Sequence, residues 1–401
     1  MNEFAEYKEK SGNCAFCGNS PVPHLPTYIF QTFNVFVGLL YKQLVSFKIY
    51  RLITKFLRYV FAYVQRIHYP LAQCMGIVTY NNDPKKATTY RSQVIWEEAL
   101  KRSIPMQQIC IFGKPVDIYR MDMQGTFVYF ESIPLPPWVD VSDYSWMDDK
   151  YLLKIHLAKQ NIPVPRCISV TTEAEAVDAY KTFSSAVIVK PRIGSRARHT
   201  AVNITNVEQL REAFAIAQQI CHFVVIEEYL PGSVCRATVI DGTLRGFLEA
   251  HQPLVVGDGV STIEELVLKK NNMRHERVGE VILTADHDNH LKKQGYSRGS
   301  VIEKDVRVEL NLHTGRLFGG ETKEYGEMIH IDMKSAIERA GKALSAPLVG
   351  FDIIVSGNPM EAGVHWGIIE ANTLPFIDLH YLPLHGTPTA VAQHIFTLWE
   401  S

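Results

Sequence analysis

Beyond Trp146, short apolar segments alternate with helical segments, and this alternation restricts the folds open to the chain. The apolar segments are rich in valine and isoleucine, which favour strands, and they are too short for ordinary helices. We expect helices at 149–160, 207–220, 262–270 and 333–344, and strands at 167–170, 186–190, 223–227, 235–240, 350–355 and 367–370. Alternation of this kind is typical of α/β or α+β layers.

The first 145 residues differ in character from the rest. Residues 1–26 are polar, 27–67 have the pattern of a helix dense in aromatic residues, and 71–135 combine short strands with a helix at 92–102. The prolines at 134, 136 and 137 mark a boundary. A chain of 401 residues also exceeds the roughly 250–300 residues that one hydrophobic core serves. We predict a helical segment at 1–70, a small α/β domain at 71–145 and a larger domain at 146–401, divided into 146–226 and 227–401.

The net charge of −1 hides an uneven distribution. Seven basic residues and no acidic one lie between Lys10 and Asn82, so the rest of the chain carries −8. A neutral total argues against a nucleic-acid partner. In the N-terminal segment, the expected helix carries one basic face, formed by Lys48, Arg51, Lys55 and Arg58. That face suits peripheral contact of residues 28–67 with anionic lipid, and it equally suits packing against the chain itself or a homo-oligomer partner.

The cysteine pattern and the termini point to a cytoplasmic protein, with the inner membrane surface as the alternative if the basic helix binds lipid. The cysteines are odd in number and scattered, which favours free thiols in a reducing compartment (14, 17, 74, 110, 167, 221 and 235). There is no secretory signal pattern, and the apolar stretch from Tyr28 to Tyr41 is too short to span a bilayer. Cys14 and Cys17 form half a zinc site at most, which His24 and Cys74 could complete only by folding together. We expect free thiols there, and a solvated loop at 287–290.

Charged and amide side chains lie where several expected strands end. Lys190 ends one strand and is followed by a basic loop, 192–199, suited to phosphate binding. Glu227 and Glu228 end the next strand along the chain. Near the C-terminus, oxygen ligands that suit Mg²⁺ follow two apolar strands (Asp352, Glu370 and Asn372). The G-x-x-x-x-G-K-[ST] and G-x-G-x-x-G nucleotide motifs are both missing from the sequence.

These residues, in this order, resemble the ATP-grasp superfamily of carboxylate–amine ligases. The likeness covers roughly residues 147–400 and is strongest to the ATP-grasp module of cyanophycin synthetase and of bifunctional glutathione synthetase. It also rests on 255–259 with 261–266, on 291–301, and on 369–375 with His380 and 385–386. The resemblance implies an ATP-grasp fold, in which two α+β subdomains grip ATP, preceded here by the small α/β domain and the helical segment.

The resemblance also implies roles for particular residues. Those expected to contact ATP are Lys150, Lys190, Ser195, Arg196, Arg198, Glu227, Glu228, Tyr229 and Leu230, the last four at the hinge beside the adenine. The metal ligands would be Asp352, Glu370 and Asn372. Lys190, Arg236 and Arg316 would serve catalysis, with Arg307 as the alternative to Arg316. The sequence departs from the family pattern at Ala197 and His199, where glycines are expected, at Val234, where an acidic residue is usual, and in lacking a Mur-ligase-like module.

The implied reaction joins an amino acid or short peptide, through its carboxylate, to an amine. ATP first phosphorylates the carboxylate, and the amine then captures the acyl phosphate to form an amide, with ADP and phosphate as products. Mg²⁺, as two ions, or Mn²⁺ would neutralise the phosphates. The alternative is a catalytically silent ATP-binding scaffold that associates with a membrane or a protein partner through its N-terminal helices.

Overall fold

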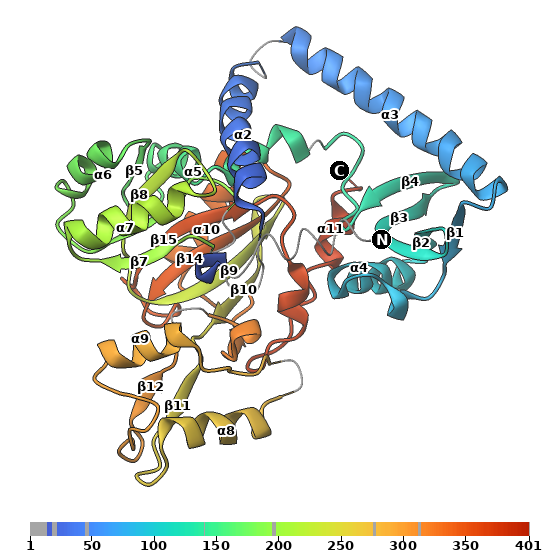
Figure 1. The fold of residues 1–401 in the computed structure, drawn as a ribbon. Helices are drawn as coiled ribbons and strands as arrows, with labels where there is room; N and C mark the ends of the chain where they lie inside the picture. The colour runs from blue at the N-terminus through green and yellow to red at the C-terminus, as the bar shows by residue number, and fades with distance from the viewer. Residues whose placement is uncertain are drawn as a thin grey trace.

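The structure is a computed structural model that describes residues 14–17, 22–44, 48–139, 141–194, 198–275, 278–311 and 314–400. Its described strands form three larger sheets and one two-stranded sheet (Figure 1). Every pair of neighbouring strands in these described sheets is antiparallel. The chain is therefore α+β within the predicted mixed class, and not a parallel α/β fold.

The small sheet lies on the right of Figure 1 and is a meander. Its strands are β1 (Val78–Asn81), β2 (Met106–Ile111), β3 (Lys114–Met123) and β4 (Thr126–Glu131), and α4 (Tyr90–Lys101) packs on it. The core includes Trp96 of α4 and Tyr119 of β3, both fully buried. It also takes in Ile395 and Phe396 of α11 (Gln393–Thr397) near the C-terminus. Two distant parts of the chain thus share one core.

A four-stranded sheet carries Lys190, which is predicted to bind the nucleotide phosphates. Its order is β5 (Cys167–Val170), β8 (Val224–Glu228), β6 (Val187–Pro191) and β7 (Ala201–Ile204). The helices α6 (Glu173–Tyr180) and α7 (Val207–Gln218) pack against it through a separate apolar core. A capping box begins α6 at Thr172, and Asn206 caps α7.

A five-stranded sheet forms the centre of the molecule. Its order is β13 (Thr322–Glu324), β10 (Thr243–Ala250), β9 (Ser233–Ile240), β14 (Leu348–Ser356) and β15 (His365–Asn372). The helices α5 (Lys150–Ala158) and α10 (Ile331–Leu344) contribute to its core. A two-stranded sheet, β11 (Leu254–Val256) and β12 (Arg307–Glu309), lies at the bottom of Figure 1 with α8 (Ile263–Met273) and α9 (Ala285–Lys293).

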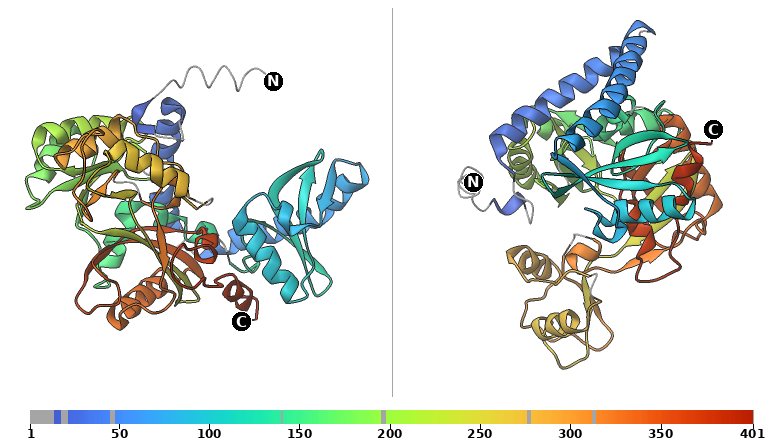
Figure 2. Two further views of the ribbon diagram at one scale, coloured as in Figure 1. Left: turned by 90° about the horizontal axis from the view of Figure 1, so that it is seen from below. Right: turned by 90° about the vertical axis from the view of Figure 1, so that its right-hand side faces the viewer.

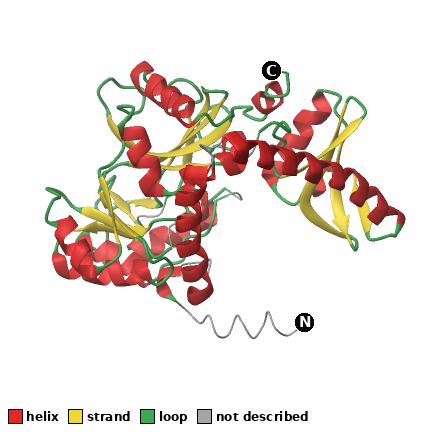
Figure 3. Ribbon diagram, turned by 90° about the horizontal axis from the view of Figure 1, so that it is seen from above, coloured by secondary structure: helices red, strands yellow, loops and turns green. Residues whose placement is uncertain are grey.

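Two long helices lead into these sheets. In place of the single predicted helix, the structure has α2 (His24–Leu44) and α3 (Lys48–Cys74), and α3 runs past the expected boundary at residue 70. Tyr69 of α3 stacks on Tyr129 of β4 at 4.6 Å between ring centroids, which fastens the end of α3 to the small sheet. Figures 2 and 3 show α3 extending from α2 to that sheet. Among the described residues, no helix is both long and apolar enough to cross a bilayer.

The expected solvated loop at 287–290 is wrong, because these residues belong to α9. His287 is buried, and its Nδ1 accepts a hydrogen bond from the backbone N–H of Thr284 at 3.2 Å, which caps the helix. The fully buried Leu291 anchors α9 to the core beneath it. Histidine, aspartate and asparagine are weak helix formers, so this helix depends on tertiary packing that local propensity does not reveal.

Candidate active site

Three charged residues line up across neighbouring strands of the central sheet. In the antiparallel register, Arg236 of β9 pairs with Asp352 of β14, and Asp352 pairs with Glu370 of β15. Residues that pair directly across strands project on the same face. The structure therefore brings together one predicted catalytic arginine and two predicted metal ligands, which are far apart in the sequence.

Asp352 holds this row together. Its Oδ1 accepts a 2.7 Å ion-pair contact from Nη2 of Arg236, and its Oδ2 accepts a hydrogen bond from Nδ2 of Asn372 at 3.3 Å. Burial and the neighbouring Glu370 carboxylate raise the pKa of Asp352 to about 6, although Arg236 opposes this. The third predicted metal ligand, Asn372, thus lies beside the other two.

Lys150 is the cation on the other side of Glu370. Its Nζ lies 3.7 Å from Oε1 of Glu370, and the lysine is buried in the first turn of α5. Burial alone would raise the pKa of Glu370, but the nearby cations, Lys150 first among them, outweigh this and lower it. The two carboxylates therefore lie between a lysine and an arginine.

Lys190 does not extend freely from its strand. Its Nζ lies 3.0 Å from Oε2 of Glu227, and Nζ of Lys154 lies 2.8 Å from the same oxygen. Glu227 is fully buried, and Lys154 is 1% exposed. Burial would raise the pKa of Glu227, but the two lysines lower it and keep the carboxylate ionised. Lys154 also donates to the carbonyl oxygen of Ile369 at 2.8 Å, next to Glu370, so it connects β8 of the four-stranded sheet with β15 of the central sheet.

A second buried ion pair, absent from our sequence prediction, fixes the start of α5. Asp149 caps the helix by accepting from the backbone N–H groups of Tyr151 and Leu152, and it accepts two bonds from Nε of Arg192 at 2.8 and 2.9 Å. Arg192 follows the strand that carries Lys190. The pair therefore couples the position of Lys150 to that strand. The signal for Lys154 was its place four residues after Lys150, on the same face of α5.

Two of the other predicted hinge residues line a cavity. Glu228 and Leu230 line a cavity of about 310 Å³ together with Val364 and Trp366, which lie at the beginning of β15. The cavity lies toward the beginning of β15, whereas Glu370 and Asn372 lie at its end. The backbone N–H of Tyr229 donates to the carbonyl oxygen of Ala186 at 2.9 Å.

Other predicted residues are more scattered. Arg198 is half-buried, and its Nη2 donates to the carbonyl oxygen of Gly194 at 3.5 Å. Ser195 and Arg196 lie outside the described residues. Arg316 donates to the carbonyl oxygen of Leu382 at 3.4 Å. The alternative catalytic arginine, Arg307, is exposed on the two-stranded sheet of β11 and β12.

The fold and this row of residues fit the ATP-grasp fold that the sequence predicts. No protein-family model matches the chain. The crystal structure of a bifunctional glutathione synthetase from Pasteurella multocida matches it with a TM-score of 0.55 and 24% identity, over 77% of this chain and 43% of that one. The predicted ATP-grasp fold is thereby confirmed.

Sequence relatives agree with the structural match. The glutathione biosynthesis bifunctional protein GshAB of Listeria monocytogenes is 26% identical over 313 residues, which is 76% of this chain and 40% of that protein. Cyanophycin synthetase of Synechocystis sp. is 27% identical over 261 residues, which is 62% of this chain and 30% of that protein. The chain is thus similar in sequence to both of these proteins, and its match spans less than half of the length of each.

Proposed function

We propose that the protein is an ATP-dependent carboxylate–amine ligase that forms an amide bond through an acyl phosphate. The observation that carries this proposal is the row of Arg236, Asp352 and Glu370 with Lys150 beside it. A carboxylate can approach ATP only where cations offset the repulsion between the two anions, and this row supplies cations on both sides of a pair of carboxylates.

The donor set fits a nucleotide with divalent cations. Asp352, Glu370 and Asn372 offer the oxygen ligands that Mg²⁺ prefers, and we propose that they hold two Mg²⁺ ions, which Mn²⁺ can replace. Bound there, the ions neutralise charge on the transferred phosphoryl group. Nε and Nη1 of Arg236 are buried and donate to no group among the described residues, so the one N–H bond of Nε and the two of Nη1 are left for an anion. We propose that Arg236 binds the acyl phosphate.

The proposed chemistry conserves atoms and charge in two steps. A carboxylate oxygen of the acid attacks the γ-phosphorus of ATP, and the bond to ADP breaks. The amine then attacks the acyl carbon, phosphate leaves and the nitrogen loses a proton. Lys150 and Lys190, with Ser195, Arg196 and Arg198 of the loop, bind the nucleotide phosphates, and the residues from Glu227 to Leu230 lie at the adenine. Arg316 assists catalysis.

We propose that the small domain takes part in substrate binding, and that the substrates are an amino acid or short peptide and an amine. Arg91 of α4 donates to the carbonyl oxygen of Leu374 at 2.9 Å and lies over the ring of Phe376 at 4.9 Å. These two residues lie two and four positions after Asn372, so α4 contacts the segment that follows the proposed metal ligands. The selectivity of the protein for its substrate would then depend on residues 71–145.

A substrate screen tests the ligase proposal. We expect ADP release only when a suitable amino acid or dipeptide and an amine are both present, with an amide product of matching mass. Lys190→Met should raise the KM for ATP by roughly tenfold or more, because one charge-assisted contact to phosphate contributes about 1.5–3 kcal/mol. Lys181→Met, which removes an exposed lysine of the same subdomain, should leave the KM unchanged. Tight ATP binding without ADP release under any substrate pair would favour the silent scaffold.

The N-terminal helices support a second candidate function, peripheral contact of a cytoplasmic protein with the inner membrane surface. Large apolar side chains of both helices are exposed, in α2 Ile29, Phe30, Phe33, Phe36 and Leu40, and in α3 Leu52, Ile53, Phe56, Val64 and Ile67. The side chains of the predicted basic face lie outside what the structure describes. Exposed apolar side chains on a basic helix are typical of an interfacial helix.

Vesicle flotation separates lipid binding from packing between copies of the chain. We expect the intact chain to float with vesicles containing anionic lipid, and Ile53→Asp with Phe56→Asp to abolish flotation. Val260→Asp is the control and should float normally, because it changes an exposed apolar residue between β11 and α8, outside the N-terminal helices. A chain that stays at the bottom of the gradient and is dimeric by light scattering would instead show that these side chains pack between two copies.

A further inference from the structure

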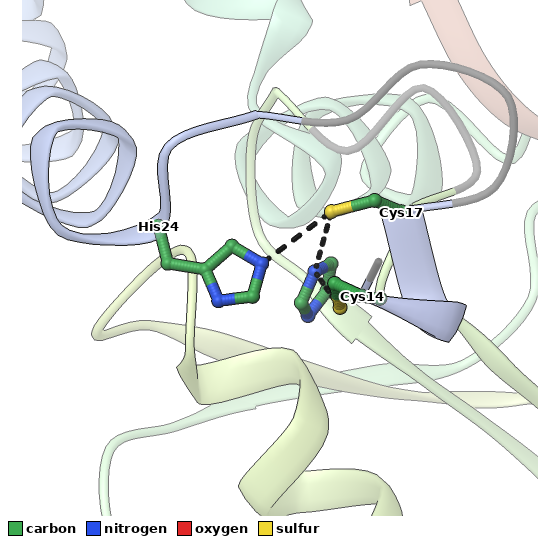
Figure 4. A group of neighbouring side chains, drawn as sticks. Cys14, Cys17 and His24 are labelled. Carbon is green, nitrogen blue, oxygen red and sulfur yellow. Dashed lines mark hydrogen bonds between the residues drawn. The ribbon is translucent and has the colours of Figure 1, made fainter. Parts of the chain in front are cut away.

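Four side chains of types that bind transition metals lie together where the N-terminal segment contacts the loop between β6 and β7. Cys14, Cys17 and His24 come from the segment, and His199 comes from the loop after Lys190. Their ligand atoms all lie within 4.8 Å of one another, and Figure 4 shows the side chains of Cys14, Cys17 and His24 close together. Cys74 is not part of this group, because it is exposed at the end of α3.

Three of the separations between ligand atoms are close to the edge lengths of a metal tetrahedron, and all of them are within 4.8 Å. Sγ of Cys17 lies 3.4 Å from Nε2 of His24 and 3.3 Å from Nε2 of His199, and Sγ of Cys14 lies 3.8 Å from the latter nitrogen. Zinc bonds of about 2.3 Å to sulfur and 2.0–2.1 Å to nitrogen place tetrahedral ligands about 3.4–3.8 Å apart. Two thiolates and two neutral imidazoles also balance the charge of Zn²⁺.

The surroundings of His199 orient its ring for a metal. Nδ1 lies 2.8 Å from the carbonyl oxygen of Ile216, so it carries the proton and donates, and Nε2 keeps its lone pair toward the cysteines. Metal-binding histidines almost always have such an outer hydrogen bond.

The backbone of His199 is held in the same place. Its φ is +50°, a conformation that non-glycine residues adopt rarely, and its N–H donates to the carbonyl oxygen of Phe16 at 2.9 Å. Phe16 lies between the two cysteines, so the Cys-x-x-Cys turn binds both the backbone and the side chain of His199. The family pattern has a glycine at this position, and a glycine would adopt this φ without strain. The strain that histidine brings is explained if its side chain has a function of its own.

We propose that Cys14, Cys17, His24 and His199 bind one structural Zn²⁺ ion, which fastens the N-terminal segment to the loop next to the nucleotide lysine. Two further contacts join α2 to the same region of the four-stranded sheet. Tyr28 of α2 lies within hydrogen-bond distance of His222 at 3.2 Å. Gln31 lies so close to Gly194 that a Cβ there would come within 2.1 Å of its side-chain nitrogen. The ion would connect residues 175 positions apart and limit how far the loop can move from α2.

Metal analysis of the full chain, purified without a metal-affinity tag, tests this proposal. We expect about one zinc ion per chain in the wild type, and loss of that zinc in Cys17→Ser and in His199→Asn. Cys74→Ser is the matched control, since it removes an exposed thiol outside the group, and it should keep the zinc. A wild-type chain without bound metal, a stoichiometric metal other than zinc, or zinc that survives Cys17→Ser would overturn the proposal.

The variant His24→Asn tests the site even if the other variants fail to fold. His24 is only half-buried, so we expect this variant to unfold at a temperature close to that of the zinc-free wild type while its zinc affinity falls roughly tenfold or more. Replacement of zinc by Co²⁺ in the wild type should give the visible absorption of a tetrahedral site with sulfur ligands. An octahedral cobalt spectrum, or an unchanged zinc affinity in His24→Asn, would contradict the four-ligand site.

Discussion

Asp352→Asn and Glu370→Ala should each lower ATP turnover by roughly a hundredfold or more, because each removes a carboxylate from the site proposed to hold Mg²⁺. The melting temperature should change little. Glu370 is half-buried at the end of its strand, and Asp352→Asn keeps the shape of a side chain whose pKa burial and Glu370 already raise to about 6. Coupled ADP release, measured across a Mg²⁺ titration, and thermal unfolding of the same samples check this prediction.

Glu361→Ala is the control for these two variants. Glu361 is an exposed carboxylate between β14 and β15 that pairs with Asn358, so it belongs to the same sheet connection but lies outside the row. Its loss should leave turnover and its Mg²⁺ dependence unchanged. Normal turnover in Asp352→Asn would contradict the proposed metal site, whereas a large fall in its melting temperature would assign Asp352 a structural role through Arg236.

Much of the fold was predictable because its strands are short runs of β-branched residues. The strand Cys167–Val170 begins and ends as predicted, and α7 differs only at its end. The strand Thr243–Ala250 was missed, since it contains Gly246 and two charged residues and is a strand because it pairs with β9. Helix α9 was missed for the same reason. Tertiary pairing and packing decide these elements, and local propensity does not.

The candidate site was predictable where its residues lie on short apolar strands, although Asp352 lies in the middle of β14 and not at its end as predicted. It was unpredictable where residues pair over long distances. Asp352 and Glu370 came together as expected because antiparallel neighbours share a face. The pairing of Asp149 with Arg192 and the joining of Cys17 to His199 depend on contacts across 43 and 182 residues. Nothing in one sequence gives the register of such contacts, so the proposed zinc site, which two distant segments share, was not visible in it.

Glu227→Gln should destabilise the fold by about 3–5 kcal/mol, because it leaves the buried ammonium groups of Lys154 and Lys190 facing each other without a counter-charge. Denaturant unfolding at pH 7 measures this effect. Lys154→Met should cost less, since Glu227 keeps Lys190 as its partner. The control Glu208→Gln removes an exposed carboxylate in the first turn of α7 and should change the free energy of unfolding by less than about 0.5 kcal/mol.

The pH dependence of the Glu227→Gln variant separates a structural role from nucleotide binding. Burial lowers the pKa of Lys154, and loss of the Glu227 charge should lower it further. The unfolded chain then binds more protons than the folded chain between neutral pH and about pH 10, so the variant should regain stability as the pH rises toward 10. If Glu227 served only to contact adenine, the variant would show a higher KM for ATP with wild-type stability at every pH. A variant that is destabilised at pH 7 and recovers at higher pH would instead show that this carboxylate keeps both lysines charged inside the fold, so that Lys190 is in place before ATP arrives.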